Sequence, residues 1–193
     1  MKKGRVLLIT PNLKGIADGV NRIQPSLGLM LIAPLLEKSG HNVKIYDAAL
    51  SGWNNQKMID EKNKIISIGD SDEDIAKEVS NFAPDVVAIS VLFSNLLESA
   101  HNIARIVKKV NKNIKVVLGG NHISCAVTDY QVSIAEGLSK FPKTIQDLEN
   151  DHFDFALTGE GEFTFPQLVD ALLNKENVDK IPGLVRKIKP KKY

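Results

Sequence analysis

Five short, mostly apolar runs recur along the chain, and each is followed within two residues by glycine, proline, serine or aspartate. Runs of this length with few polar residues are typical of strands buried on both faces of a sheet. The longer segments between them repeat apolar residues at helical spacing. Strands that alternate with crossover helices predict an α/β fold with a doubly wound, mostly parallel five-stranded sheet. The expected strands are residues 6–9, 43–46, 86–89, 114–118 and 155–157, and the expected helices are residues 26–38, 72–82, 95–110 and 163–174.

Three segments depart from this simple alternation. The first expected helix is apolar nearly all round, so we expect it to be well buried, with Pro34 kinking or splitting it. Residues 48–71 form a long link that holds the single tryptophan, Trp53, which could either cover a ligand or pack the link against the body. Residues 123–152 are expected to be an insertion before the last strand, with a helix around residues 144–149.

The composition narrows the class of protein. The 193 residues suit one domain, residues 1–186, followed by a basic segment, 187–193, that reads as a tail or a cut linker. A net charge of +2, from 25 basic and 23 acidic side chains, predicts no nucleic-acid or membrane partner. The N-terminal apolar run is too short for a signal peptide or a membrane span. The single cysteine, Cys125, cannot form an internal disulfide, and it favours a reducing, cytoplasmic location.

The candidate ligand site lies just beyond the expected strands, because open parallel sheets bind ligands outside the carboxyl ends of their strands. Glycine at such ends lets a backbone approach a ligand closely, and helix N-termini offer free amides to a phosphate. A ligand with a phosphate and a large flat body would suit this edge, and several nucleotide-like cofactors would fit it equally well. The candidate residues are Thr10, Pro11, Asn12, Ser26, Gly28, Ser90, Leu92, Gly119, Gly120, His122, Gly159, Glu160 and Gly161.

Missing motifs exclude the commoner nucleotide sites. No G-x-G-x-x-G follows the first strand, and the chain contains no G-x-x-x-x-G-K-[ST] phosphate loop. The third strand ends in Ser90 rather than aspartate, and no acidic pair follows the first strand, which argues against a phospho-acceptor receiver domain.

The ordered motifs resemble the cobalamin-binding N-terminal domain of cobalamin-dependent radical S-adenosylmethionine proteins. Ser90-x-Leu92, separated by 26 residues from Gly119-Gly120, is similar to the SxL and GG elements of that family. The similarity runs from about residue 6 to residue 186, and each motif falls at an expected strand end. The other similar stretches are residues 25–30, 36–43, 84–90, 116–122, 158–163 and 181–185.

The resemblance implies a flavodoxin-like, Rossmann-like cobalamin-binding fold with the corrin ring over the carboxyl ends of the strands. The nucleotide tail, with its dimethylbenzimidazole base, would enter a groove beside the first and third strands. Ser90 would contact the buried base, and Leu92 would line the slot. The residues implied to leave room for the tail or flank it are Gly119, Gly120, Gly159, Glu160, Gly161, Ser26 and Gly28.

Two departures from related patterns sharpen this expectation. Residues 11–24 contain no histidine, so the D-x-H-x-x-G element that supplies a cobalt ligand in methionine-synthase-like domains is absent. The resemblance therefore implies cobalamin bound base-off, with no protein histidine on cobalt and no metal ligand from this chain. With one cysteine, the chain also lacks the C-x-x-x-C-x-x-C motif that would hold a 4Fe-4S cluster. S-adenosylmethionine and the cluster would belong to a missing C-terminal radical domain, the expected partner, and the chain alone would not be catalytic.

Several alternatives remain open from the sequence. The chain could be a module of a larger enzyme of methyl transfer, radical rearrangement or cyclisation, a free-standing cobalamin-binding or sensing protein, or a flavodoxin-like domain for another nucleotide. His122 could approach the ligand or cap backbone groups after the double glycine. Glu160 could act as an acid or base, whereas Glu162 better suits a helix N-terminus. Cys125 could be a thiolate ligand to cobalt, but a lone cysteine is more often a small buried hydrophobe, and this is what we expect.

Overall fold

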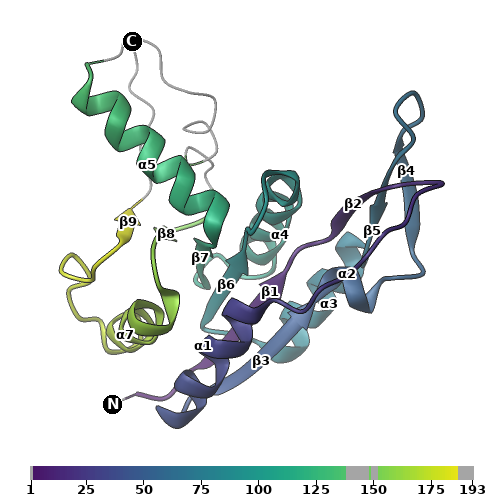
Figure 1. The fold of residues 1–193 in the computed structure, drawn as a ribbon. Coiled ribbons are helices and arrows are strands. Elements are labelled where there is room, and N and C mark those ends of the chain that lie inside the picture. The colour runs from purple at the N-terminus through teal and green to yellow at the C-terminus, as the bar shows by residue number, and fades with distance from the viewer. Residues whose placement is uncertain (1, 138–147, 149–151, 187–193) are drawn as a thin grey trace.

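The computed structural model describes residues 2–137, 148 and 152–186, and its centre is a six-stranded sheet in the order β3-β1-β6-β7-β8-β9 (Figure 1). The first five of these strands run parallel, and β9 is antiparallel to β8. The α/β, doubly wound, mostly parallel sheet is therefore confirmed, and β9 is an addition that the hydrophobic pattern did not predict. The strands are β1 (Arg5–Thr10), β3 (Asn42–Asp47), β6 (Val86–Ser90), β7 (Lys115–Gly119), β8 (Phe155–Leu157) and β9 (Leu184–Arg186).

Helices cover both faces of this sheet, and each face has its own apolar core. Successive residues of a strand point to opposite faces, so Val6 and Leu8 enter one core while Leu7 and Ile9 enter the other. The helices α1 (Leu27–Lys38) and α7 (Gly161–Asn174) pack on the Val6 face. On the Leu7 face lie α3 (Asp72–Phe82), the 3-10 turn η1 (Ser94–Leu96), α4 (Leu97–Val110) and α5 (Asn121–Ala135).

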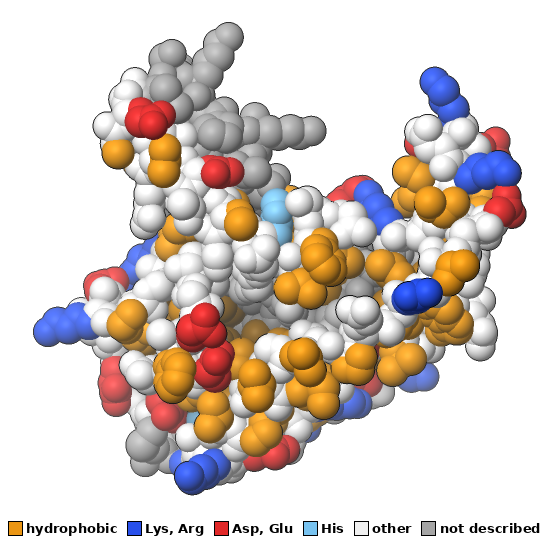
Figure 2. Space-filling view, viewed as in Figure 1, with side chains coloured by type: hydrophobic (Ala, Val, Ile, Leu, Met, Phe, Trp, Pro, Cys, Tyr) orange, Lys and Arg blue, Asp and Glu red, His pale blue; other side chains and the backbone are white. Residues whose placement is uncertain are grey.

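Helix α1 differs from expectation in its burial. It runs unbroken through Pro34, and only Leu29, Ala33 and Leu36 are buried. These residues follow i, i+4, i+7 spacing and form a single stripe against the sheet. Most of the remaining apolar positions face outward, although Ile32 is partly buried, and Figure 2 shows orange side chains gathered over this helix. The exposed apolar residues of α1 are Leu27, Met30, Leu31 and Leu35.

The long link contributes two strands, β4 (Gln56–Asp60) and β5 (Ile65–Ile68), to a second sheet that the sequence did not predict. With β2 (Leu13–Ile16) they form an antiparallel sheet in the order β2-β5-β4, which projects to one side of the molecule (Figure 1). Helix α2 (Ala48–Ser51) leads into it, and the half-buried Trp53 lies in the turn that follows.

The expected insertion begins as a regular crossover helix. Residues 121–135 form α5, which connects β7 to β8 along the chain and packs Ile123 and Ala126 into the core. The helix expected around residues 144–149 and the basic segment 187–193 lie outside the described residues. Within the part of the chain that the structure describes, no helix is both long and apolar enough to cross a membrane.

β9 pairs with the free edge of β8, and a glycine in the turn before β9 lets the two backbones approach closely. The Thr158 N–H donates to the Gly183 carbonyl (2.9 Å), and Leu157 pairs with Leu184. Gly183 has φ +71°, and a Cβ at this position would lie 2.4 Å from the Thr158 carbonyl oxygen. Only glycine fits this close approach of two backbones.

A buried phenol ties the main sheet to the start of α3, and we expect Tyr46→Phe to lower the free energy of unfolding. The Tyr46 hydroxyl donates to the Asp70 carboxylate (2.5 Å), and a hydrogen bond to a charged group contributes about 1.5–3 kcal/mol. Burial, together with this hydrogen bond, holds the pKa of Tyr46 above its ordinary value. The stabilisation is therefore complete below the unfolded pKa of about 10 and declines at higher pH, where only the unfolded phenol ionises.

Urea unfolding of wild type and Tyr46→Phe at several pH values checks this expectation. The difference between the two should be largest near neutral pH and should shrink as the pH rises above about 10. A difference that stays constant across this range would show that the ionisation of Tyr46 is not linked to folding.

Candidate functional site

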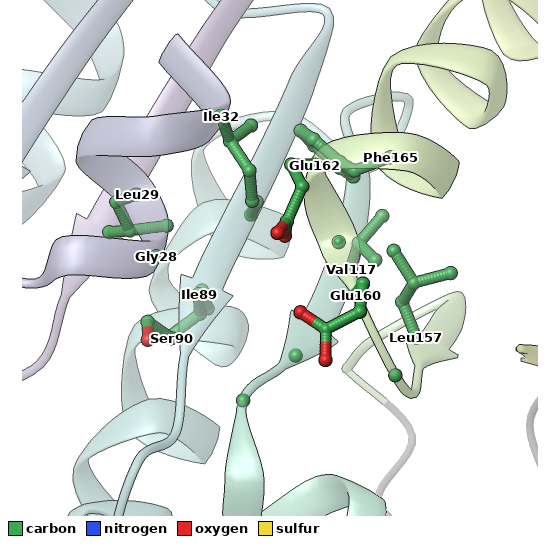
Figure 3. A pocket seen from close by; sticks show the side chains of 15 residues that line it. Gly28, Leu29, Ile32, Ile89, Ser90, Val117, Leu157, Glu160, Glu162 and Phe165 are labelled. Carbon is green, nitrogen blue, oxygen red and sulfur yellow. The ribbon is translucent and has the colours of Figure 1, made fainter.

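A narrow slot opens between α1 and α7, above the carboxyl ends of β6, β7 and β8 (Figure 3). Its volume is about 200 Å³, which is smaller than the roughly 300–1,000 Å³ typical of sites for whole drug-sized ligands. It can therefore accept a compact flat group but not a large ring system. The residues that line it are Gly28, Leu29, Ile32, Ala88, Ile89, Ser90, Val117, Gly119, Gly120, Leu157, Gly159, Glu160, Gly161, Glu162 and Phe165.

Seven of the predicted site residues meet in this slot. They come from four separate parts of the chain, and the sheet brings them together because parallel strands end at the same edge. Ser90 and Gly119 are direct neighbours in the register of β6 and β7. The seven are Gly28, Ser90, Gly119, Gly120, Gly159, Glu160 and Gly161.

The interior of the slot is apolar and its rim is largely glycine. Leu29, Val117 and Phe165 belong to the core between the sheet and helices α1 and α7. A Cβ added at Gly28 or Gly159 would meet nothing within 4 Å, so these glycines leave open space at the mouth. An apolar interior with a few polar groups at the entrance suits a planar aromatic group joined to a polar tail.

Gly161 fixes the width of the slot. A Cβ at this residue would lie 3.1 Å from Cδ1 of Ile32, so glycine lets the start of α7 approach α1 closely. Figure 3 shows the side chains of Ile32, from α1, and Glu162, from α7, on either side of the slot. The two helices thus form opposite walls that a thin ligand would separate.

The double glycine forms a tight turn beneath the slot. The Val91 N–H donates to the Gly119 carbonyl (2.7 Å), and the His122 N–H donates to the Val91 carbonyl (3.1 Å). Gly120 has φ +107°, and a Cβ there would lie 2.7 Å from the Val91 carbonyl oxygen. His122 is itself only 7% exposed in the first turn of α5, and its side chain has contacts within the protein.

Two carboxylates flank the mouth from the start of α7. Glu160 is the N-cap residue, but its side chain makes no capping hydrogen bond. Glu162 is half-buried and lines the slot, although its sequence position suggested only a helix N-terminus. Both acids offer hydrogen-bond acceptors near a ligand. The alternation of Glu160 and Glu162 with Gly159 and Gly161 is the sequence signal that could have identified Glu162 as a residue of the slot.

The other predicted residues lie outside the slot. Thr10 ends β1 and Asn12 follows it. Thr10 Oγ1 and Asn12 Oδ1 are buried without hydrogen-bond partners among the described residues, so both could accept a ligand donor. Asn12 lines a separate polar groove with Lys14 and Asp70, beside the β2-β5-β4 sheet. Pro11, Ser26 and Leu92 also fall outside the lining of the slot, and Leu92 stands exposed beyond β6.

The described residues contain no cluster of three or more histidine, cysteine, aspartate or glutamate side chains that could hold a metal ion. The expectation of a buried cysteine is wrong, because Cys125 is exposed on α5. Ser124 beside it accepts a hydrogen bond from the Gly159 N–H (3.4 Å), which ties α5 to the rim of the slot.

Comparisons with known proteins identify a family for this chain. The sequence model of the B12 binding domain matches residues 13–137. Cytidylyl-2-hydroxyethylphosphonate methyltransferase of Streptomyces wedmorensis is 31% identical over 93% of this chain and 30% of its own length. An uncharacterized methyltransferase of Pyrococcus horikoshii is 30% identical over 95% of the chain and 33% of its length. Hopanoid C-3 methylase of Methylococcus capsulatus is 26% identical over 85% of this chain and 25% of its own length. The chain thus spans a third or less of these curated relatives.

A solved structure of a cobalamin-binding protein from Desulfitobacterium hafniense DCB-2 aligns with a TM-score of 0.48 at 14% identity. The alignment covers 89% of this chain and 60% of that one.

Proposed function

The chain belongs to the B12 binding domain family, and from this we propose that it is the cobalamin-binding module of a cobalamin-dependent radical S-adenosylmethionine methyltransferase. The observation that carries the proposal is the slot between α1 and α7, with its apolar interior, glycine rim and Ser90 at the strand end. The names of the curated relatives favour methyl transfer over rearrangement or cyclisation.

The dimensions of the slot fit one part of cobalamin. The dimethylbenzimidazole base is flat, aromatic and compact, whereas the corrin ring is far larger than a cavity of about 200 Å³. We therefore assign the slot to the base and its nucleotide tail. Val117, Leu157 and Phe165 would pack against the base, and the open space at Gly28 and Gly159 would admit the tail.

Polar groups at the mouth would hold the tail in place. The Ser90 hydroxyl can donate to a ring nitrogen of the base, and the carboxylates of Glu160 and Glu162 can accept from ribose hydroxyls. These contacts would keep the base away from the cobalt, so cobalamin would be bound base-off. His122 is buried and already has a partner in the protein, and we propose that it does not coordinate cobalt.

The role of this chain in the reaction is binding and orientation. When cobalamin is bound, the chemistry it supplies is transfer of a methyl group through its cobalt. The side chains of the slot would anchor the tail, and the ends of the strands would help to orient the ring. S-adenosylmethionine and a 4Fe-4S cluster would be held by a further domain, the partner, because this chain has one cysteine and cannot build such a cluster.

Titration of the purified chain with hydroxocobalamin, followed by desalting and visible absorbance, tests the proposal. We expect one corrinoid per chain, with an absorbance spectrum that lacks benzimidazole coordination. Cobinamide, which has the ring without the nucleotide tail, should be retained much more weakly, because the slot would stay empty.

Flavin mononucleotide serves as the competing ligand in the same experiment. Retention of the flavin with no retention of hydroxocobalamin would contradict the proposal and favour a flavodoxin-like domain for another nucleotide. Reading the gene on both sides of this sequence separates a module of a larger enzyme from a free-standing cobalamin-binding protein.

A further inference from the structure

Two large apolar side chains stand exposed on the turn that follows β6. Leu92 is 47% exposed and Phe93 is 61% exposed, while Val91 immediately before them is fully buried. We refer to Leu92 and Phe93 as the apolar pair. Exposure of such side chains to water is unfavourable, so a ligand that covered them would gain from their burial.

The backbone that carries the apolar pair is fixed at both ends. On one side, Val91 donates to Gly119 (2.7 Å) and accepts from His122 (3.1 Å). On the other side, the Leu96 N–H donates to the Phe93 carbonyl (3.0 Å), and Leu96 is buried. The pair cannot turn inward without breaking these hydrogen bonds, so its exposure is built into the fold. Apolar side chains held outward beside a binding slot indicate a surface that a ligand covers.

The position of the pair relative to the slot identifies the part of the ligand that would cover it. Leu92 lies two residues beyond Ser90, which lines the slot at the end of β6. The slot is too small for a corrin ring, so a base held there keeps its tethered ring outside, over the strand ends. Figure 2 shows this face hollowed between the β2-β5-β4 sheet and α5.

We propose that the apolar pair lies against the lower face of the corrin ring and shields the cobalt there from axial ligands. This inference rests on the proposed function, and it assigns Leu92 and Phe93 as positioning residues. Neither side chain contains an atom that can coordinate cobalt, and their bulk excludes water from the space below the ring. An apolar shell of this kind controls solvent access to a metal and thereby its reduction potential.

Histidine substitutions on the full chain test the assignment directly. The chain is loaded with hydroxocobalamin, reduced to cob(II)alamin and studied by electron paramagnetic resonance, in which an axial nitrogen splits each cobalt line into a triplet. We expect no nitrogen splitting in the wild type and triplets in Leu92→His or Phe93→His. Leu35→His, an exposed leucine in the last turn of α1, is the matched control and should leave the spectrum unchanged.

A double variant, Leu92→Ala with Phe93→Ala, covers the case in which histidine weakens retention of cobalamin. In deuterated water, electron spin echo modulation reports solvent deuterium close to cobalt. We expect a weak deuterium signal in the wild type and a clear increase in the double variant, because the shield has been removed.

The outcomes separate this inference from the proposed function. If the wild type holds cobalamin but neither the histidine variants nor the alanine double variant alters the signals, the pair faces away from cobalt and the inference is wrong. Nitrogen splitting in the wild type would overturn it as well. A wild-type chain that retains no cobalamin would contradict the proposed function itself, and this inference with it.

Discussion

Ser90→Tyr should leave the chain folded and remove its retention of cobalamin. Ser90 is half-buried at the end of β6, and its side chain borders the slot between α1 and α7 (Figure 3). A tyrosine ring is about the size of the base proposed to bind there, so it would occupy the slot itself. Losing the burial of one aromatic ring costs about 3 kcal/mol, which corresponds to a roughly 100-fold weaker Kd.

The measurement is the absorbance of retained corrinoid after desalting, with cobinamide titrated in parallel. Cobinamide has no base to lose, so its binding should be nearly the same in wild type and Ser90→Tyr. Ser80→Tyr, at an exposed position of α3, is the matched control for adding a tyrosine. Undiminished cobalamin binding by Ser90→Tyr would show that the base does not enter this slot.

Gly120→Ala is expected to destabilise the chain by about 3–5 kcal/mol. Gly120 has φ +107°, a backbone conformation that costs an L-residue about 1–3 kcal/mol. The added Cβ would also lie 2.7 Å from the carbonyl oxygen of Val91 and 3.0 Å from its nitrogen. These are backbone atoms held by two hydrogen bonds, so relief of the contact requires the turn after β6 to move.

Gly159→Ala separates backbone strain from steric contact. Gly159 also has a positive φ, +79°, but an added Cβ would meet nothing within 4 Å. We expect a loss of only about 1–2 kcal/mol there, the cost of a left-handed conformation alone. Urea unfolding followed by circular dichroism measures both variants, and equal losses would show that the contact with Val91 relaxes freely.

Most of the main sheet could be predicted from the sequence because β1, β6, β7 and β8 are largely buried and therefore form short, continuous apolar runs. The edge strand β3 is mostly exposed, and its β-branched and aromatic residues, Val43, Ile45 and Tyr46, carried its prediction. The meeting of Ser90 with Gly119 followed from the same pattern, since neighbouring parallel strands end at one edge. Helix α3 was equally clear, because Ser71 caps its start and Ile75 and Val79 repeat at helical spacing.

The second sheet could not be predicted in this way because its strands are largely solvent-exposed. β2 and β4 lack a buried residue, so neither leaves a continuous apolar run. The prediction that α1 is well buried failed for the opposite reason. Its composition is apolar all round, but a helix on one sheet face buries one stripe, and Leu27 remains 72% exposed. Composition alone does not reveal which stripe has a partner.

The position of Leu92 required three-dimensional information. The resemblance implied that Leu92 lines the slot with Ser90, but residues two apart lie on the same side only while a strand continues. β6 ends at Ser90, and Leu92 beyond it is exposed and does not line the slot. The position of Glu162 in the slot was not predicted, because an acidic residue in the first turn of a helix is already explained by the helix dipole.

The antiparallel strand β9 gives the chain a mechanical property. β9 ends at Arg186 and is hydrogen-bonded to β8. Thr158, directly after β8, is hydrogen-bonded to Gly183 and adjoins Gly159 at the mouth of the slot. A pull on the end of β9 would load its pairing with β8 lengthwise, in the direction that shears its hydrogen bonds together. Tension applied at the end of β9 would reach the rim of the ligand site through the short β8–β9 pairing, before it reached the other strands of the sheet.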